Sequence, residues 1–217
     1  MGVDGFYNEG SRSLQDHFDS RRLADRLEQR KVTDRIDDDD RAFIESVDML
    51  FMATADESGR PNCSYKGGDP GFVKVLDDRT IAFPGYDGNG MFVSFGTLLV
   101  NPEVGLLFIS FERGRRLRLN GTASVDPDDE LVPAWPGAQL VDRVRAREVF
   151  PNCPRYIHRY ELVERSRYVP VAGIEPPVPD WKTREWARDV LPTSDQASRA
   201  SVSAPSISPK SRSAMSP

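Results

Sequence analysis

The sequence predicts a mainly β fold with some α-helix (α+β), in which an antiparallel β-barrel is interrupted by one helix and preceded by a helical extension. Two observations support this prediction. Short apolar runs between residues 50 and 125 are joined by turn residues about every 8 to 12 positions, as in antiparallel barrels and sandwiches and unlike βαβ repeats. One longer apolar run, residues 91–100, ends at Asn101-Pro102, and because a residue before proline avoids the α conformation, this run is expected to be a helix.

The N-terminal residues 1–45 are expected to form the helical extension. Leu14, Phe18, Leu23 and Leu27 recur near helical spacing among many charges, which predicts an amphipathic helix at the edge of the domain. Four consecutive aspartates, Asp37–Asp40, then precede a second helical pattern. They lack the spacing and glycine of a calcium loop, so they are interpreted as the N-cap and first turn of a helix.

Residues 46–170 are expected to form the barrel domain. Seven segments have the pattern of strands: residues 50–55, 62–66, 72–75, 80–83, 104–111, 116–125 and the region around 143–147. In the last segment, Val144 and Ala146 alternate with arginines, which indicates a strand with one charged face. The predicted order is therefore four strands, one helix and three strands.

The C-terminal part of the chain divides in two by composition. Residues 171–193 include DWKTREWARDV, which is expected to form a short amphipathic helix whose tryptophans pack against protein rather than stack on a ligand. Residues 194–217 are rich in Ser, Pro and Ala and contain no aromatic residue. Such a segment cannot bury enough apolar surface to offset its conformational entropy, so we expect this tail to be disordered.

Charge and composition exclude several classes of function. The net charge of −5 and the pI near 5.2 argue against nucleic acid as a partner. The apolar stretches are too short for a membrane-spanning helix and the N-terminus does not resemble a secretory signal, so we expect a cytoplasmic protein with no membrane partner. The two cysteines, Cys63 and Cys153, provide neither a disulfide framework nor a metal site, and we expect buried free thiols.

Five segments, in this order, carry a resemblance to a known family: SYKGGDPGFV (64–73), FPGYDGNGM (83–91), LLVNPEVGLLF (98–108), RLRLNGTA (116–123) and FPNCPRYIH (150–158). They resemble the pyridoxamine 5′-phosphate oxidase-like family over roughly residues 43–170. The resemblance implies a split β-barrel of the FMN-binding type and a homodimer with the cofactor at the subunit interface. The family also includes proteins that bind F420 or heme, so the fold does not determine the cofactor.

A flavin phosphate requires cationic and hydroxyl donors, and these occur in two segments. Ser64 and Lys66 share one face of a predicted strand, and Asn89 and Gly90 open the apolar helix, whose N-terminus favours an anion. The resemblance implies that the phosphate is held by residues from both segments: Ser64, Lys66, Asn89, Gly90, Met91 and Ser94. In the alternative interpretation, Lys66 is an exposed lysine at a strand end and Asn89 serves a turn.

The sequence also departs from the oxidase itself at this site. It has Asn-Gly-Met-Phe-Val-Ser where the oxidase has basic residues at the helix start, and Pro61 where the oxidase has an arginine. Basic contacts that would match a phosphorylated substrate are not evident. We therefore do not predict a true pyridoxamine 5′-phosphate oxidase.

Two further groups are candidates for cofactor binding. Arg116 and Arg118 share a strand face and are suited either to an anionic reduced flavin or an acidic substrate, or simply to solvation. The resemblance places the FPNCPRYIH segment near the flavin of the neighbouring subunit, which implies contacts from Asn152, Arg155 and Tyr156.

These observations predict an FMN-dependent oxidoreductase that acts on an unidentified small molecule. Flavin supplies the chemistry, so no catalytic residue is assigned. The alternative is an F420-binding or heme-binding split barrel without FMN oxidase activity. For heme, only His17 and His158 offer an imidazole ligand. A structural role for His158 is the alternative interpretation.

Overall fold

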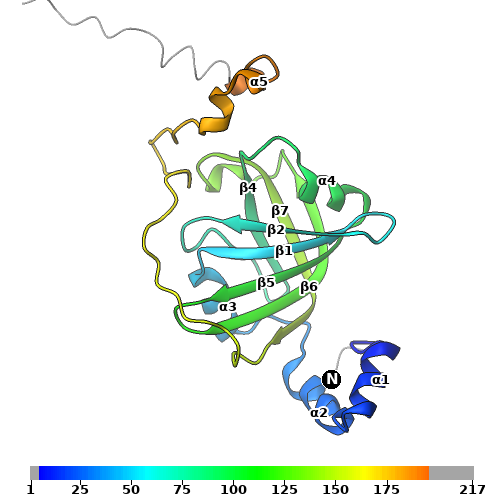
Figure 1. The fold of residues 1–217 in the computed structure, drawn as a ribbon. Coiled ribbons are helices and arrows are strands. Elements are labelled where there is room, and N and C mark those ends of the chain that lie inside the picture. The colour runs from blue at the N-terminus through cyan, green and yellow to red at the C-terminus, as the bar shows by residue number, and fades with distance from the viewer. Residues whose placement is uncertain (1–4, 196–217) are drawn as a thin grey trace, which may run out of the picture. The chain divides into compact units, whose positions relative to one another are not determined.

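The computed structural model describes residues 5–195, and its central feature is one antiparallel sheet of seven strands that curves into a barrel (Figure 1). The strand order is β2-β1-β5-β6-β7-β4-β3. The strands are β1 (Met49–Ala55), β2 (Pro61–Gly67), β3 (Lys74–Val75), β4 (Thr80–Tyr86), β5 (Glu103–Ser110), β6 (Arg115–Asp126) and β7 (Ala138–Pro151). Helix α4 (Val93–Val100) lies between β4 and β5 in the chain. The predicted order and the split-barrel fold are confirmed.

The interior of the barrel is the hydrophobic core of this fold. Apolar side chains of every strand except β2 point into it and are joined by residues from α3 (Asp38–Ser46) and α4. The largest fully buried side chains are those of Phe43, Phe83 and Phe108. Because successive side chains of a strand alternate between its two faces, the outer face of β7 carries arginines, as its sequence predicts.

A β-bulge at Gly121 adjusts the pairing of the two longest strands. The register between β6 and β7 shifts between Asn120 and Gly121. A Cβ atom at Gly121 would collide with the backbone carbonyl of Arg145, so only glycine allows this close approach.

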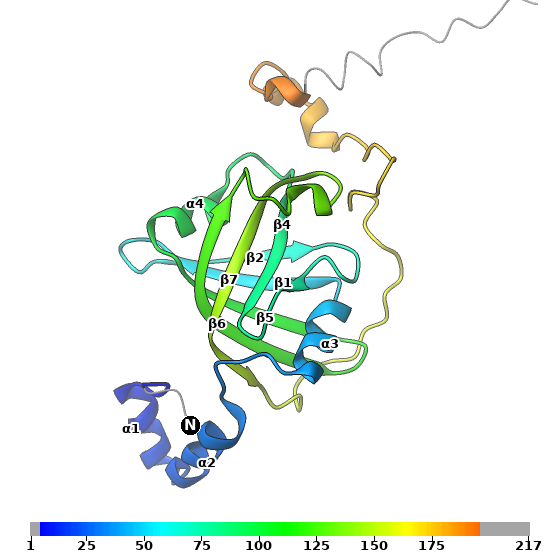
Figure 2. The same cartoon turned by 180° about the vertical axis from the view of Figure 1, so that it is seen from behind.

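The N-terminal extension contains two helices in place of the single amphipathic helix expected: α1 (Glu9–His17) and α2 (Arg21–Lys31) (Figure 2). They are joined mainly by polar contacts, since Arg12 pairs with Asp25 at 2.5 Å and with Glu28 at 3.6 Å. The apolar side chains that suggested an amphipathic helix are exposed: Leu14, Phe18, Leu23 and Leu27.

The aspartate run caps α3, as predicted. The side chain of Asp37 accepts a hydrogen bond from the backbone N–H of Asp40 at 2.8 Å. Burial and the neighbouring carboxylates Asp37 and Asp39 raise the pKa of Asp40 to about 6, against the opposing charge of Arg115. Asp39 in turn pairs with Arg115 at 2.7 Å, which ties α3 to the start of β6.

The chain divides into two compact units, Met1–Pro176 and Pro177–Pro217. After β7, an extended segment runs along the outside of the barrel (Figures 1 and 2). The second unit contains a short 3-10 helix (Asp180–Thr183) and α5 (Glu185–Arg188), and the rings of Trp181 and Trp186 stack with centroids 6.1 Å apart. Apart from residues 194 and 195, the predicted disordered tail lies outside the described residues.

None of the helices within residues 5–195 is long and apolar enough to cross a membrane.

Candidate functional site

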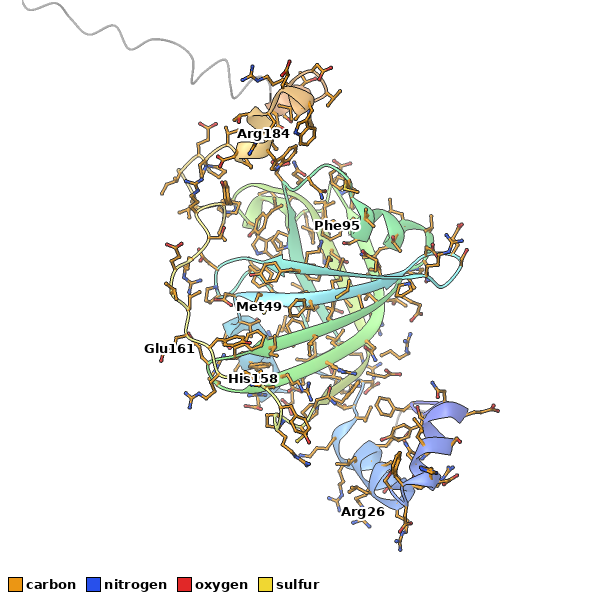
Figure 3. All side chains as sticks on the ribbon, in the orientation of Figure 1. Arg26, Met49, Phe95, His158, Glu161 and Arg184 are labelled. Atoms are coloured by element: carbon orange, nitrogen blue, oxygen red, sulfur yellow. The ribbon has the colours of Figure 1, made fainter. Side chains whose placement is uncertain are left out.

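A cavity of about 460 Å³ lies where the start of α4 faces β2 and the end of β4. Its walls come from β2, the end of β4, the segment 88–92, the first turn of α4 and Leu140 of β7. Figure 3 labels Phe95, which lines the cavity from α4. Six residues that the sequence assigned to a flavin phosphate all line this cavity: Ser64, Lys66, Asn89, Gly90, Met91 and Ser94.

A hydroxyl and amide cluster forms one wall of the cavity. The hydroxyl of Ser94 donates to Ser64 Oγ at 2.9 Å, and Asn62 Nδ2 donates at 3.5 Å to Ser94 Oγ. Every second side chain of β2 points to the same face of the strand. The face that looks toward α4 carries Asn62, Ser64 and Lys66. The cluster provides hydrogen-bond donors that are held in place before any ligand arrives.

The N-terminus of α4 forms the opposite wall. Phe92 precedes the helix with a φ of 49°, and this left-handed conformation is rare and strained for an aromatic residue. No side chain caps the helix and no acidic residue occupies its first turn. The backbone N–H groups of that turn therefore remain available to an anion, and the helix dipole favours negative charge there.

This geometry also explains why the helix begins at Val93 and not at residue 91. Gly90 has a φ of 74°, and Asn89 Oδ1 accepts a hydrogen bond from the backbone N–H of Met91 at 3.0 Å. Because of these contacts and the left-handed Phe92, Met91 and Phe92 belong to a turn, although the apolar pattern alone placed them in the helix.

Lys66 is the one cationic residue that lines the cavity within residues 5–195. Its ammonium lies 4.1 Å from the centroid of the Phe95 ring, a cation–π contact. Burial lowers the pKa of Lys66, and the opposing effect of Asp142 is smaller. Gly85 makes room for this contact, because a Cβ atom there would lie 3.0 Å from the Phe95 ring and nearer still to Leu140.

Asp142 is a buried carboxylate that the sequence interpretation missed. It lies on the inner face of β7, is fully buried, and neither carboxylate oxygen has a hydrogen-bond partner among the described residues. Burial raises its pKa to about 7, although the charge of Lys66 acts in the opposite direction. The alternation of β7 could have revealed it, because Val144 and Ala146 point inward and position 142 continues the same face.

The remaining predicted residues gather in a second place. Arg116 Nη2 donates to the backbone carbonyl of Cys153 at 2.7 Å, and the guanidinium of Arg155 lies 6.0 Å from the Tyr156 ring. The Nε of Arg116 and the Oδ1 of Asn152 are buried without a hydrogen-bond partner among residues 5–195. Arg118 is exposed on β6, opposite Phe150 of β7.

This second group does not reach the cavity at the start of α4. None of its five predicted residues lines the cavity: Arg116, Arg118, Asn152, Arg155 and Tyr156. Leu140 and Pro151 lie eleven residues apart on β7, so about 35 Å of strand separates the cavity from the segment that follows β7. Within one chain, the predicted residues therefore lie in two separate places.

The expectation of buried thiols is wrong, because Cys63 and Cys153 are both exposed free cysteines. Cys63 falls on the outward face of β2, and Cys153 lies in the segment that leaves the barrel after β7. A hydrogen bond from the backbone of Arg155 and the positive charges of Arg155 and Arg116 lower the pKa of the Cys153 thiol. His158 is exposed on the same segment.

The fold is that of a split-barrel protein with a cavity at the start of α4. The family model described as pyridoxamine 5′-phosphate oxidase matches residues 36–165, which is more than half of the chain. The chain therefore belongs to the pyridoxamine 5′-phosphate oxidase family.

The chain is also similar to several solved structures. The tagged HupZ protein of Group A Streptococcus is 19% identical, with 54% of this chain and 93% of that chain covered and a TM-score of 0.44. An FMN-binding protein of Syntrophomonas wolfei is 12% identical, with 67% of this chain and 96% of that chain covered and a TM-score of 0.39. HutZ, a heme storage protein of Vibrio cholerae, is 20% identical, with 55% of this chain and 92% of that chain covered and a TM-score of 0.36. No curated protein matches the sequence.

Proposed function

We propose that this protein is an FMN-binding oxidoreductase that acts on a small molecule. One observation supports the proposal above all: Lys66, the Ser64–Ser94 hydroxyl pair and the uncapped N-terminus of α4 converge on one cavity. Membership of the pyridoxamine 5′-phosphate oxidase family supports a flavin as the ligand of this cavity.

The donors of the cavity fit the phosphate of FMN. Its oxygens accept hydrogen bonds from an ammonium, from hydroxyls and from backbone N–H groups, and Lys66, Ser64, Ser94 and the first turn of α4 supply these kinds of donor. Within residues 5–195, Lys66 is the only cation that lines the cavity, and Pro61 stands where the oxidase has an arginine. When bound, FMN supplies the redox chemistry, and the residues of the chain provide placement and charge.

We further propose that the functional unit is a homodimer. Met91, Phe92 and Val93 line the cavity and are nevertheless exposed, and an exposed apolar patch at a binding site is typical of an interface. A second copy would also bring the group around Arg116 and Arg155 to the cavity, which one chain cannot do. Sedimentation velocity tests this part of the proposal, because a monomer at micromolar concentration would contradict it.

The proposed cofactor can be tested by titrating the purified protein with FMN and following flavin absorbance and fluorescence. Lys66→Ala removes a charged hydrogen bond, and we expect about 10- to 150-fold weaker FMN binding. Lys74→Ala is the matched control, because Lys74 also places its ammonium over an aromatic ring, that of Trp135 at 4.7 Å, but does not line the cavity. Circular dichroism should show both variants folded.

The same titration separates the alternative cofactors. Binding of F420 in preference to FMN would replace the cofactor and leave the site assignment intact. A Soret band after addition of hemin, lost in His158→Ala, would favour a heme-binding protein. If FMN fails to bind, or binds equally well to the wild type and Lys66→Ala, the proposed flavin site is wrong.

A further inference from the structure

A second and larger cavity, of about 700 Å³, lies beside the barrel. It is enclosed on one side by residues 160–170 of the extended segment, which we call the strap. Its other walls come from the junction of α3 and β1, the end of β2, and the hairpin between β5 and β6. Met49 and Glu161, both labelled in Figure 3, belong to the barrel wall and to the strap, respectively.

Side-chain contacts hold the strap over this cavity at two points. The ring of Tyr160 packs against Phe111 of the hairpin, with centroids 4.9 Å apart. Further along, Arg165 pairs with Asp69 at 3.2 Å and with Asp48 at 3.9 Å. The strap has no strand pairing between these points, so its position over the cavity depends on a ring contact and on ion pairs.

Several aromatic residues line the strap cavity. They are Tyr65, Tyr86, Phe111, Tyr160 and Tyr168. Gly67 allows Tyr65 to lie close to the backbone of β2, because a Cβ atom there would lie 2.7 Å from the Tyr65 ring. Flat aromatic walls select a flat ligand, since stacked and edge-to-face contacts both need a ring as partner.

The strap cavity adjoins the cavity at Lys66. Tyr65 and Tyr86 line both, so the two cavities are neighbours. Tyr86 sits at a register shift between β4 and β7, at the end of β4. Burial, with a smaller effect of Asp69, raises the pKa of Tyr86 to about 12, so its phenol stays protonated at neutral pH and can donate a hydrogen bond.

The charges around the strap cavity disfavour a phosphate. Its two arginines are Arg113, which donates to Ser46 Oγ at 2.7 Å, and Arg165, which forms the ion pairs with Asp69 and Asp48. Carboxylates outnumber them in the lining, which contains Asp48, Glu112, Glu161 and Glu164. A phosphate here would meet a lining that carries more negative than positive charges, and one of its two arginines is already paired with carboxylates.

We propose that the strap cavity binds the substrate, and that the substrate is a flat aromatic molecule, neutral or cationic, that carries no phosphate. This inference rests on the proposed function only in naming the ligand a substrate, because the cavity can be tested for binding without any flavin. It assigns the two cavities different chemistry: an anion is held at Lys66, and an uncharged or cationic ring is held beneath the strap.

Pyridoxamine and pyridoxamine 5′-phosphate form a matched pair of probes, since they differ only by the phosphate. Each is titrated calorimetrically into protein saturated with FMN, so that the phosphate cannot bind at Lys66, and into protein without FMN. We expect pyridoxamine to bind the FMN-saturated protein at least tenfold more tightly than its phosphate, and to bind the FMN-free protein as well. Tighter binding of the phosphate to the FMN-saturated protein, or no binding of pyridoxamine to either, would overturn the inference.

Two variants locate the binding in the strap cavity. Tyr160→Ala removes a ring from the wall, and we expect about 2- to 10-fold weaker binding of pyridoxamine. Val163→Ala is the control, because Val163 lies on the strap, is 96% exposed and does not line the cavity. Equal binding by Tyr160→Ala and Val163→Ala would refute the location.

A double variant tests the effect of the negative charges on the strap. Replacing both strap carboxylates, Glu161→Gln with Glu164→Gln, keeps shape and hydrogen bonding but removes two negative charges. We expect the preference for pyridoxamine over its phosphate to shrink by severalfold, and an unchanged preference would contradict the charge argument. If FMN does not bind but pyridoxamine binding still depends on Tyr160, the proposed flavin function fails and the strap cavity stands as a binding site.

Discussion

The buried carboxylate of Asp142 allows a sharp test of the structure through Asp142→Asn. In the folded protein its pKa is about 7, against an ordinary value of 3.8, because the charged form is desolvated and has no hydrogen-bond partner among the described residues. Between these two values the folded state binds more protons than the unfolded state. Stability is therefore lost as the pH rises through this window, which is the opposite of a carboxylate in an ion pair.

The size of the effect follows from the shift. For a folded pKa of about 7 and an unfolded pKa of 3.8, linkage gives a loss of about 2.5 kcal/mol in the free energy of unfolding between pH 5 and pH 8. Asparagine cannot ionise, so this part of the pH dependence should vanish in Asp142→Asn. The buried amide has its own cost, about 1–3 kcal/mol, but that cost does not change with pH.

Urea unfolding of the wild type and the variant at pH 5 and pH 8, at one protein concentration, measures the effect. The quantity to compare is the change in unfolding free energy with pH, because the contributions of all other groups cancel between the two proteins. Asp128→Asn, which removes an exposed carboxylate, is the control and should show the same pH dependence as the wild type. If the unfolding free energy of Asp142→Asn changes with pH as much as that of the wild type, Asp142 ionises in the folded state as it does in water. The conclusion that this carboxylate is buried without a hydrogen-bond partner would then be wrong.

Three further predictions concern the cofactor and the fold. FMN affinity should fall as the pH rises through about 7, because ionised Asp142 offsets the charge of Lys66, and a titration series should show this fall reduced in Asp142→Asn. Asp37→Ala removes the N-cap of α3 and should cost about 1 kcal/mol in the free energy of unfolding. Gly121→Ala should lower the free energy of unfolding by at least about 2 kcal/mol, because the new methyl group collides with the backbone of β7. Gly96→Ala on α4, where the space is open, should raise it by about 0.5–1 kcal/mol. Urea unfolding measures both.

The strands of the barrel were predictable because each is marked by a local signal. Turn residues such as Gly59 and Gly114, both at positive φ, separate apolar runs that have the length of a strand. The helix at 91–100 was also predictable, but its first residue was not. Its start depends on the left-handed Phe92, and no propensity scale predicts an aromatic residue in that conformation.

The site could be predicted only in part, for a related reason. Lys66 and Asn89 belong to segments whose contact the family resemblance implies, and the structure brings both segments to one cavity. The strap cavity had no local signal, because its aromatic residues come from segments far apart in the sequence and from a stretch without regular secondary structure. The exposure of Cys153 was missed for the same reason, since burial in an irregular segment depends on tertiary contacts.

The separation of the two groups of predicted residues is itself an argument about assembly. Arg116 carries a buried Nε without a hydrogen-bond partner among residues 5–195, and Asn152 beside it carries a buried Oδ1 in the same state. Buried polar atoms of this kind are costly, and a ligand or a second chain would relieve the cost. The cavity at Lys66 has the complementary deficit, because it holds a single cation for a phosphate that carries up to two charges. In the homodimer we propose, one contact between the two groups would remove both deficits, so a mixed dimer of Lys66→Ala and Arg155→Ala subunits should retain one intact FMN site, whereas either variant alone should have none.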